Sequence, residues 1–193
     1  MQALSAEQVN QLLKNRRSIF PKFYIDKPIP KDIIEQILEN ANWAPNHRHT
    51  APWRFIVFRE SGLTKLSTYL ANYYKKHIHP DKYAEAKYQK TLNKPLQSSC
   101  VIAICMQRNA KAIVPEWEEI AAVACAVQNM YLTCTAYNIG CYWSTPKSIT
   151  EANDFLELPE GQRCLGLFYM GYHEMPEFTS PRSPVEEKTR WEE

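Results

Sequence analysis

The longest apolar stretch of the chain runs from Glu116 to Ile139, EWEEIAAVACAVQNMYLTCTAYNI. It begins after Pro115 and ends before Gly140, two residue types that commonly mark helix boundaries and that are absent within it. Its apolar residues go most of the way round a helical cylinder, which predicts a helix buried on several sides. The pair Gln128–Asn129 interrupts the apolar run well short of the roughly 18 to 20 residues of a membrane span. A plain core helix of any α-rich domain would also fit this segment.

Shorter amphipathic patterns predict helices on either side. Ser5 and Gln8 have the spacing of a capping box, so a first helix starts there and ends near Arg16. Residues 33–41 carry apolar side chains on one face, and Pro45 stops that second helix.

A third helix follows the turn at residues 60–62. Residues 75–94 are rich in lysine and tyrosine and only weakly patterned, which favours a solvated helical excursion or a lid over a nucleic-acid patch. Ser148 and Glu151 again have capping-box spacing, so we expect a last helix from near Ser148 to just before Pro159.

Apolar runs at residues 53–58, 100–106 and 163–170 predict strands. Buried strands separated by helices imply a central sheet covered on both faces. Three or four strands make a narrow sheet, which favours completion by a partner chain. The prolines after His173 exclude a free-standing helix or a central strand there, so this tail is either disordered or lies against something else.

The composition narrows the class of protein. A chain of 193 residues fits a single domain, 1–193, and a net charge of +2 gives no electrostatic case for a nucleic-acid partner. The polar N-terminus lacks the apolar core of a signal peptide, and the six cysteines lie mostly in apolar runs without a C-x-x-C pair. We therefore expect a cytoplasmic protein with reduced cysteines.

The sequence Arg16-Arg17-Ser18 follows the first helix directly. Two guanidinium groups and a hydroxyl can hold a phosphate through charge-assisted hydrogen bonds. The alternative is that cationic residues at the end of a helix simply interact favourably with its dipole.

Residues 43–54, WAPNHRHTAPWR, bring prolines, tryptophans, histidines and arginines into one loop. Such a loop can present flat and polar groups to a hydroxylated ligand, or it can be a rigid structural loop that anchors Trp53 in the core. His47 and His49 lack the further ligands of a metal site, so we expect no metal there.

Residues 141–146, CYWSTP, follow the long helix with an aromatic pair and two hydroxyls. These groups could face a ring system, or could close the core and cap the next helix. The chain has no G-x-G-x-x-G, P-loop or G-x-S-x-G motif, so any nucleotide is bound in another way.

Taken in this order, the segments resemble the FMN-dependent nitroreductase family over about residues 10–172, and the small, minimal members most of all. The resemblance is carried by RRS after the first helix, WAPNHRHTAPWRF after the second, the long helix ending IGCYWST, and the strand LGLFYMGYHE.

This resemblance implies an α+β fold, a three-layer α-β-α sandwich with a central mixed sheet, in a homodimer whose long helices pack together. Two FMN sites would lie at the subunit interface, and the tail 173–193 would extend onto the partner. Arg16, Arg17 and Ser18 would hold the FMN phosphate and ribityl chain. The other implied contacts are Trp43, Pro45, Asn46 and His47 from the other subunit, and Trp143, Ser144 and Thr145 beside the ring or the ribityl chain.

The chain departs from the family pattern in three places. Ala51 replaces a common glutamine, and Phe20 stands where many members have a basic residue, although Lys22 is close by. Ser144 and Thr145 stand where near relatives often have a tryptophan-arginine-serine run. These departures affect nicotinamide preference and substrate choice more than FMN binding.

The family implies a ping-pong oxidoreductase, in which NADH or NADPH gives a hydride to flavin N5 and a nitroaromatic, quinone or similar small-molecule acceptor then takes it. The cofactor carries this chemistry, so no catalytic side chain is expected. Arg16 or Lys22 near the N1–C2 edge would stabilise negative charge on the reduced cofactor. The rivals are a non-catalytic flavin-binding or interaction dimer on the same fold, and a ring-fragmenting or dehalogenating flavin enzyme.

Overall fold

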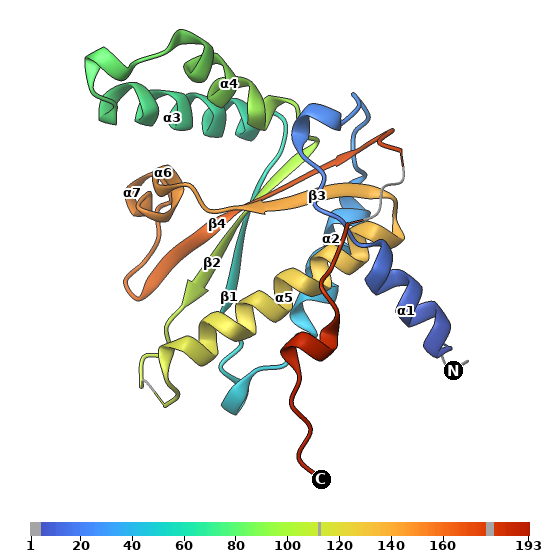
Figure 1. Cartoon of the computed structure of the whole chain (residues 1–193). Coiled ribbons are helices and arrows are strands. Elements are labelled where there is room, and N and C mark those ends of the chain that lie inside the picture. Colours follow the sequence, from blue (N-terminus) through green and yellow to red (C-terminus); the bar gives the residue numbers. More distant parts are fainter. Residues whose placement is uncertain (1–4, 112, 177–179) are drawn as a thin grey trace.

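The computed structural model describes residues 5–111, 113–176 and 180–193, and a four-stranded sheet forms its centre (Figure 1). The strand order is β1-β2-β4-β3, and every pairing among these described strands is antiparallel. Among the described residues the sheet is therefore antiparallel, and not mixed as the resemblance implied. Helical connections can return a chain to either end of a sheet, so helices between strands do not require parallel pairing. The strands are β1 (Trp53–Phe58), β2 (Cys100–Gln107), β3 (Ile139–Ser144) and β4 (Gln162–Tyr172).

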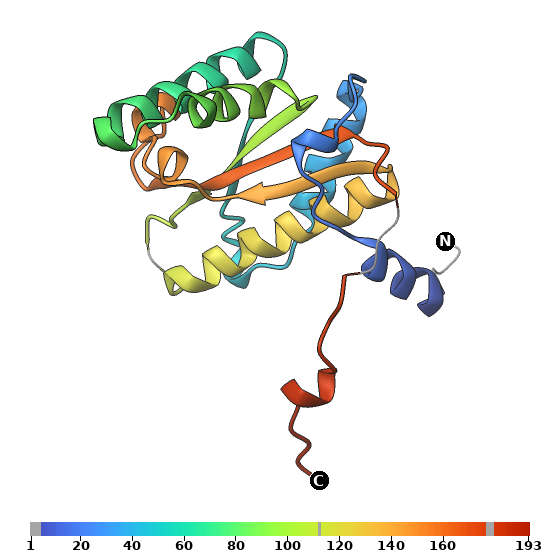
Figure 2. The same ribbon diagram turned by 45° about the horizontal axis from the view of Figure 1, so that its top comes forward.

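Helices cover both faces of the sheet and complete the predicted three-layer α-β-α sandwich (Figures 1 and 2). On one face lie α2 and α5, with α1 beside α5; on the other lie α3, α6 and α7, with α4 packed along α3. The helices are α1 (Ala6–Asn15), α2 (Lys31–Asn42), α3 (Ser61–His77), α4 (Glu85–Leu96), α5 (Glu116–Ala136), α6 (Lys147–Thr150) and α7 (Asn153–Leu156). None of the helices in the described ranges has the length and apolarity to cross a bilayer.

Alternation along the central strands explains why their sequences are continuously apolar. In β2, Ile102 and Ile104 belong to the core beneath α2 and α5, whereas Val101 and Ala103 belong to the core beneath α3. A strand with helices on both sides needs apolar residues at every position. The predicted strands at 53–58, 100–106 and 163–170 are thereby confirmed.

The long helix ends earlier than its apolar pattern predicted. α5 stops at Ala136, Asn138 has a left-handed φ of 54°, and Ile139 begins β3. The predicted helical segment to Ile139 is therefore wrong in its last turn, because an apolar edge strand continues the pattern without a break. Gly140 lies inside β3, where a Cβ would come within 2.9 Å of Tyr24 and His173, so close packing explains this glycine.

The helix predicted from Ser148 to Pro159 is also corrected. The chain forms two one-turn helices there, and Pro146 precedes the first, so Ser148 is not a capping residue. By contrast, the capping box at the start of α1 is confirmed: Gln8 N donates to Ser5 Oγ at 3.2 Å and Ser5 N to Gln8 Oε1 at 3.0 Å.

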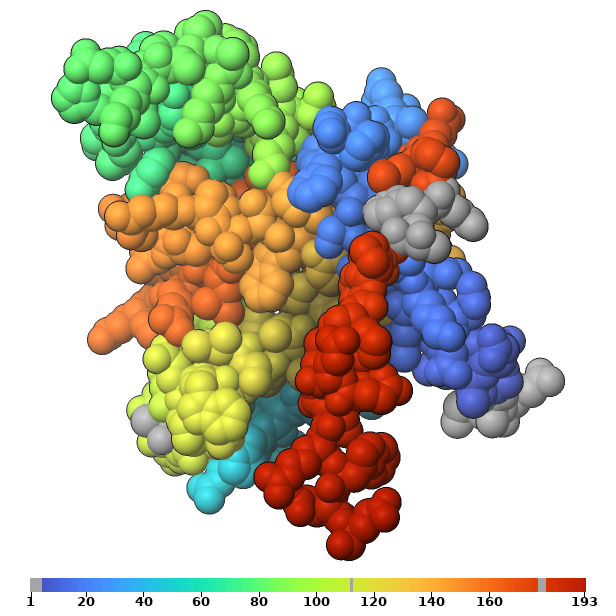
Figure 3. Space-filling view, in the orientation of Figure 1, coloured from blue at the N-terminus to red at the C-terminus, as the bar shows by residue number. Residues whose placement is uncertain are grey.

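Residues 75–94 comprise the end of α3, the short 3-10 turn η3 (Pro80–Lys82) and most of α4. They form a helical hairpin in which α4 packs along α3. Residues 180–193, with the 3-10 turn η4 (Val185–Lys188), project from the rest of the molecule (Figures 2 and 3). Trp191 on this segment is 80% exposed. Residues 177–179 of the predicted tail lie outside the described residues.

Candidate functional site

Arg16, Arg17 and Ser18 lie where α1 ends, beside the outer edge of β3. Arg16 closes the helix by donating its backbone N–H to Leu12 O at 3.2 Å. Immediately after Ser18, Ile19 donates its N–H to Cys141 O of β3 at 2.9 Å. The segment is therefore held against the sheet by backbone hydrogen bonds. The Arg17 guanidinium donates to Lys14 O and, at 2.8 Å, to Arg16 O.

Tyr131 of α5 brings these residues together with Trp143. Its hydroxyl accepts a hydrogen bond from Trp143 N at 2.7 Å and shares one with the Ser18 side chain, while the guanidinium carbon of Arg16 lies 5.3 Å from its ring centroid. Burial raises the pKa of Tyr131 above its usual value, so the hydroxyl stays neutral. Nothing in the sequence pattern distinguished Tyr131 from its apolar neighbours on the helix.

Trp143 carries a buried indole Nε1 that has no hydrogen-bond partner among the described residues. The indole lies over Gly166 of β4, whose φ is 137° and where a Cβ would come within 2.6 Å of Trp143 Nε1 and Ser144 O. Gly166 thus makes room for the indole and the strand end. Buried donors without a partner are rare in folded proteins, so this indole Nε1 is a candidate to bind a polar ligand.

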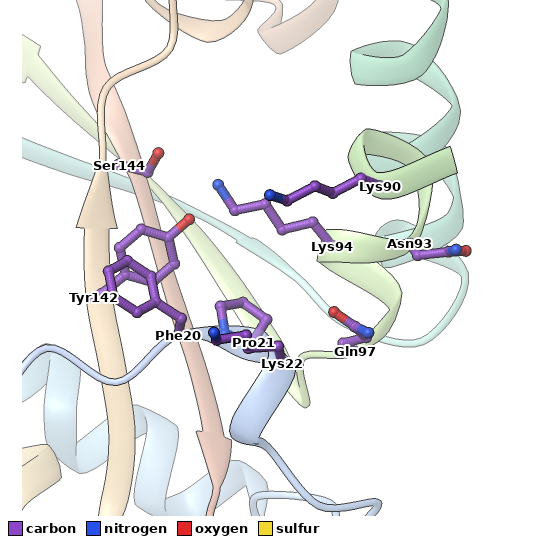
Figure 4. Close-up of a pocket in the computed structure, with 9 residues that line it drawn as sticks. All are labelled: Phe20, Pro21, Lys22, Lys90, Asn93, Lys94, Gln97, Tyr142 and Ser144. Carbon is purple, nitrogen blue, oxygen red and sulfur yellow. The ribbon is translucent and has the colours of Figure 1, made fainter. Parts of the chain in front are cut away.

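A cavity of about 640 Å³ opens on the other side of β3 (Figure 4). This volume lies within the roughly 300–1,000 Å³ of small-molecule sites. Phe20 and Tyr142 form an aromatic wall with ring centroids 4.8 Å apart. The lining residues are Phe20, Pro21, Lys22, Lys90, Asn93, Lys94, Gln97, Tyr142 and Ser144.

Lys94 is a further functional candidate that the sequence did not reveal. Its ammonium lies 4.9 Å from the ring centroid of Tyr142 and 4.7 Å from that of Tyr169. Burial, and secondarily the nearby charge of Lys90, lowers the pKa of Lys94 to about 8. Only the spacing of α4, which places Lys90 and Lys94 one turn apart, could have indicated such a pair.

The loop with Trp43, Pro45, Asn46 and His47 lies away from this group. His47 Nδ1 is 2.6 Å from Glu118 Oε2, near the start of α5. Glu118 and Tyr131 are 13 residues apart on that helix, or about 20 Å at ~1.5 Å per residue. One chain therefore does not bring the two halves of the predicted site together.

Asn46 and Trp43 of this loop each form a hydrogen bond with a nearby residue, although Trp43 remains largely exposed. Asn46 Oδ1 accepts a hydrogen bond from Ala51 N at 3.0 Å, and Trp43, 78% exposed, donates its Nε1–H to Glu39 at 3.0 Å. The structural alternative is present as well, since Trp53 is buried and donates to Asn42 Oδ1 at 3.0 Å. Anchoring of Trp53 and presentation of Trp43 are compatible, because the two indoles lie at opposite ends of the loop.

The backbone of the loop is strained at three non-glycine residues. Arg48, His49 and Ala51 have φ angles of 51°, 55° and 38°. Left-handed conformations at such residues are uncommon and cluster at functional sites. This strain favours a ligand-binding role for the loop in addition to its anchoring role.

The fold is an α+β three-layer sandwich, and its polar groups gather beside the edge strand β3. Similarity to known proteins identifies the family. Residues 13–172 match the sequence model of the Nitroreductase family, and the chain belongs to that family. The putative NAD(P)H nitroreductase YfhC of Bacillus subtilis is 28% identical, covering 94% of this chain and 96% of that protein.

Solved structures agree with this assignment. A nitroreductase-like family protein from Bacillus cereus superposes with a TM-score of 0.83 at 26% identity, covering 100% of this chain and 99% of that one. The FMN-dependent nitroreductase NfnB from Mycobacterium smegmatis, solved in complex with NADPH, superposes with a TM-score of 0.77 at 16% identity, covering 97% and 99%.

Replacing Tyr131 with phenylalanine should lower the free energy of unfolding by roughly 1–3 kcal/mol, because Trp143 N–H loses its acceptor while the ring under Arg16 remains. Urea denaturation measures the change. Tyr137→Phe, at a 41% exposed residue just after the same helix, serves as the control. Equal losses in the two variants would contradict the role given to the Tyr131 hydroxyl.

Lys94 should titrate with a midpoint near pH 8, charged below it and neutral above it. Lysine side-chain NMR across pH measures this midpoint. Lys90→Gln should raise it, because a repelling positive charge is removed, whereas Lys87→Gln, outside the cavity lining, should leave it in place. A wild-type midpoint near the ordinary value of about 10.4 would show that Lys94 is not desolvated.

Proposed function

We propose that this chain is an FMN-dependent NAD(P)H oxidoreductase of the nitroreductase type, acting on a nitroaromatic, quinone or similar electrophilic acceptor. The observation that carries the proposal is the gathering of Arg16, Ser18 and Trp143 around Tyr131, next to a cavity that Ser144 lines. Family membership and the FMN- and NADPH-binding of NfnB support it.

The residues present fit FMN. Arg16 and Arg17 offer positive charge, and Ser18 offers a hydroxyl, for a phosphate and a polyol chain. Trp143 contributes an unpaired indole donor, and Ser144 and Thr145 add hydroxyls at the end of the strand. This set combines donors for an anionic, hydroxylated tail with flat surfaces for a ring.

When bound, FMN would supply the hydride chemistry, accepting from NADH or NADPH and giving to the acceptor. The chain itself supplies charge and position. Lys22 and Lys94 line the cavity beside Tyr142 and Ser144. They would supply the positive charge near the flavin ring that many family members supply from the position of Phe20. Phe20 packs on Tyr142 and shapes the aromatic wall.

Exposed apolar surface supports a homodimer. The outer face of α5 exposes Trp117 together with Ala121, Ala124 and Cys125. α1 contains no buried residue, and Val9 and Leu13 on its apolar side are 41% and 48% exposed. Helices with uncovered apolar faces favour association with another copy. We propose that the partner's loop 43–47 meets the Arg16–Ser18 group in such a dimer, and that the tail 180–193 lies on the partner.

Purified protein should be yellow, and NADH or NADPH should bleach it. Replacing both Arg16 and Arg17 with alanine should reduce FMN retention by at least about tenfold, because the phosphate loses two charge-assisted contacts, while circular dichroism stays unchanged. Flavin absorbance after gel filtration measures the retention.

Lys14→Ala, one turn earlier on α1, is the matched control and should keep its FMN. Unchanged FMN affinity in the arginine double variant would overturn the phosphate assignment. A yellow protein that neither nicotinamide bleaches would favour the non-catalytic flavin-binding dimer instead.

Hybrid dimers test whether each site uses two chains. One chain carries Arg16→Ala and Arg17→Ala, the other His47→Ala, with different affinity tags. If the arginines and His47 of one site come from different chains, the hybrid has one intact site and should retain about one FMN per dimer, while both parent dimers lose it.

Pairing the arginine variant with a Trp143→Ala chain is the control, because those residues share one chain and no intact site forms. A hybrid with His47→Ala that holds no more FMN than its parents would place the whole site within a single chain. Elution of the wild type as a monomer would exclude the shared site altogether.

A further inference from the structure

Helix α4 turns one side toward the cavity beside β3. Lys90, Asn93, Lys94 and Gln97 follow one another at intervals of three or four residues, so they share one helical face. Figure 4 shows the side chains of Lys90 and Lys94 reaching from α4 across the cavity toward Tyr142 and Ser144. The ammonium groups of Lys90 and Lys94 thus border the cavity on the side of α4.

Positive charge in this cavity is not balanced. Lys22, Lys90 and Lys94 are among its lining residues, and no aspartate or glutamate is. None of these three lysines forms an ion pair with the residues that the structure describes. Lys90 and Lys94 repel each other, which contributes to the lowered pKa of Lys94. A bound anion would relieve this repulsion.

The three lysines are not equivalent. Lys94 lies over the rings of Tyr142 and Tyr169, and Lys22 lies 4.6 Å from the ring centroid of Phe23. Lys90 is exposed and makes no ring contact or ion pair in the described part of the chain. It is therefore the lysine of this cavity whose ammonium is available to a molecule that enters and leaves.

The cavity also favours a flat ring. Phe20 and Tyr142 offer aromatic surface, and their centroids are 4.8 Å apart in a tilted arrangement. Aromatic walls stabilise flat ligands through burial and ring contacts. An aromatic ring bearing a negative charge matches both the wall and the lysines.

We propose that the acceptors of this enzyme are aromatic anions, such as nitroarenes with a carboxylate, and that Lys90 is the residue that selects them. This inference rests on the proposed function. For a nitroarene the two-electron step consumes one NAD(P)H and one proton, the nitro group becomes a nitroso group, and one oxygen leaves as water. Lys90 takes no part in this electron transfer; it attracts and orients the carboxylate.

The test compares 4-nitrobenzoate with 4-nitrobenzamide, which have nearly the same shape and differ in charge. The ratio of their kcat/KM values is measured for the FMN-loaded wild type, Lys90→Gln, Lys90→Glu and the control Lys87→Gln. In ping-pong turnover the acceptor's kcat/KM is independent of the donor, so the nicotinamide's own phosphates do not enter the ratio.

The wild type should prefer the carboxylate by roughly tenfold, the effect of one well-placed charge pair at a partly exposed site. Lys90→Gln should remove most of this preference and Lys90→Glu should reverse it. Lys87→Gln, on the same helix but outside the cavity lining, should leave the ratio of kcat/KM values unchanged. Added salt should reduce the wild-type preference, because it screens exposed charges.

A second readout does not depend on turnover. The dissociation constants of both nitroarenes for the oxidised protein, followed by the change in flavin absorbance, should show the same order across the four proteins. Equal ratios in the wild type and Lys90→Gln, with both acceptors reduced, would overturn the role of Lys90 and leave the proposed function standing.

Two other outcomes are distinguishable. If Lys90→Gln changes kcat/KM for NADPH relative to NADH but not the acceptor ratio, Lys90 serves the phosphate of the donor and the inference is wrong. If neither nicotinamide reduces the bound flavin, the proposed function fails and this inference fails with it.

Discussion

The site depends on one constraint: the outer edge of β3, which no neighbouring strand pairs in this chain's described sheet, needs hydrogen-bond partners. An edge strand leaves backbone N–H and C=O groups that need partners. In this chain Tyr131 accepts from Trp143 N at 2.7 Å, and Ile19 donates to Cys141 O at 2.9 Å. These two hydrogen bonds cover the edge and bring the end of α1 and the C-terminal part of α5 to the same place. Arg16, Ser18 and the backbone of Trp143 therefore all lie beside Tyr131.

Much of the fold could be predicted from the sequence because it is recorded in local patterns. The capping box of Ser5 and Gln8 and the continuous apolar run of β2 gave the right elements. β3 was missed because Ile139 continues the apolar pattern of the helix before it. Tyr131 and Lys94 were missed because their importance comes from contacts across the fold, which no spacing in the sequence records.

The candidate site was predicted in two halves, and the structure of one chain keeps them apart. The group at Arg16 and Ser18 lies beside Tyr131 in the C-terminal part of α5, and His47 lies beside Glu118 near its start. The resemblance to the family implied a dimer that would join the two halves. The residue types alone indicated only which kinds of ligand group each half could bind. Trp117 and Leu13 are apolar side chains that remain exposed in the single chain, and the proposed dimer rests on such residues.

The left-handed residues of the loop after Pro45 have a consequence for stability. Glycine would adopt the backbone angles of Arg48 and His49 with less strain, so substitution by glycine would be an accessible route to a more stable chain. The chain instead keeps large polar side chains there. The polar side chains at this bend therefore come with a backbone strain that glycine would not carry.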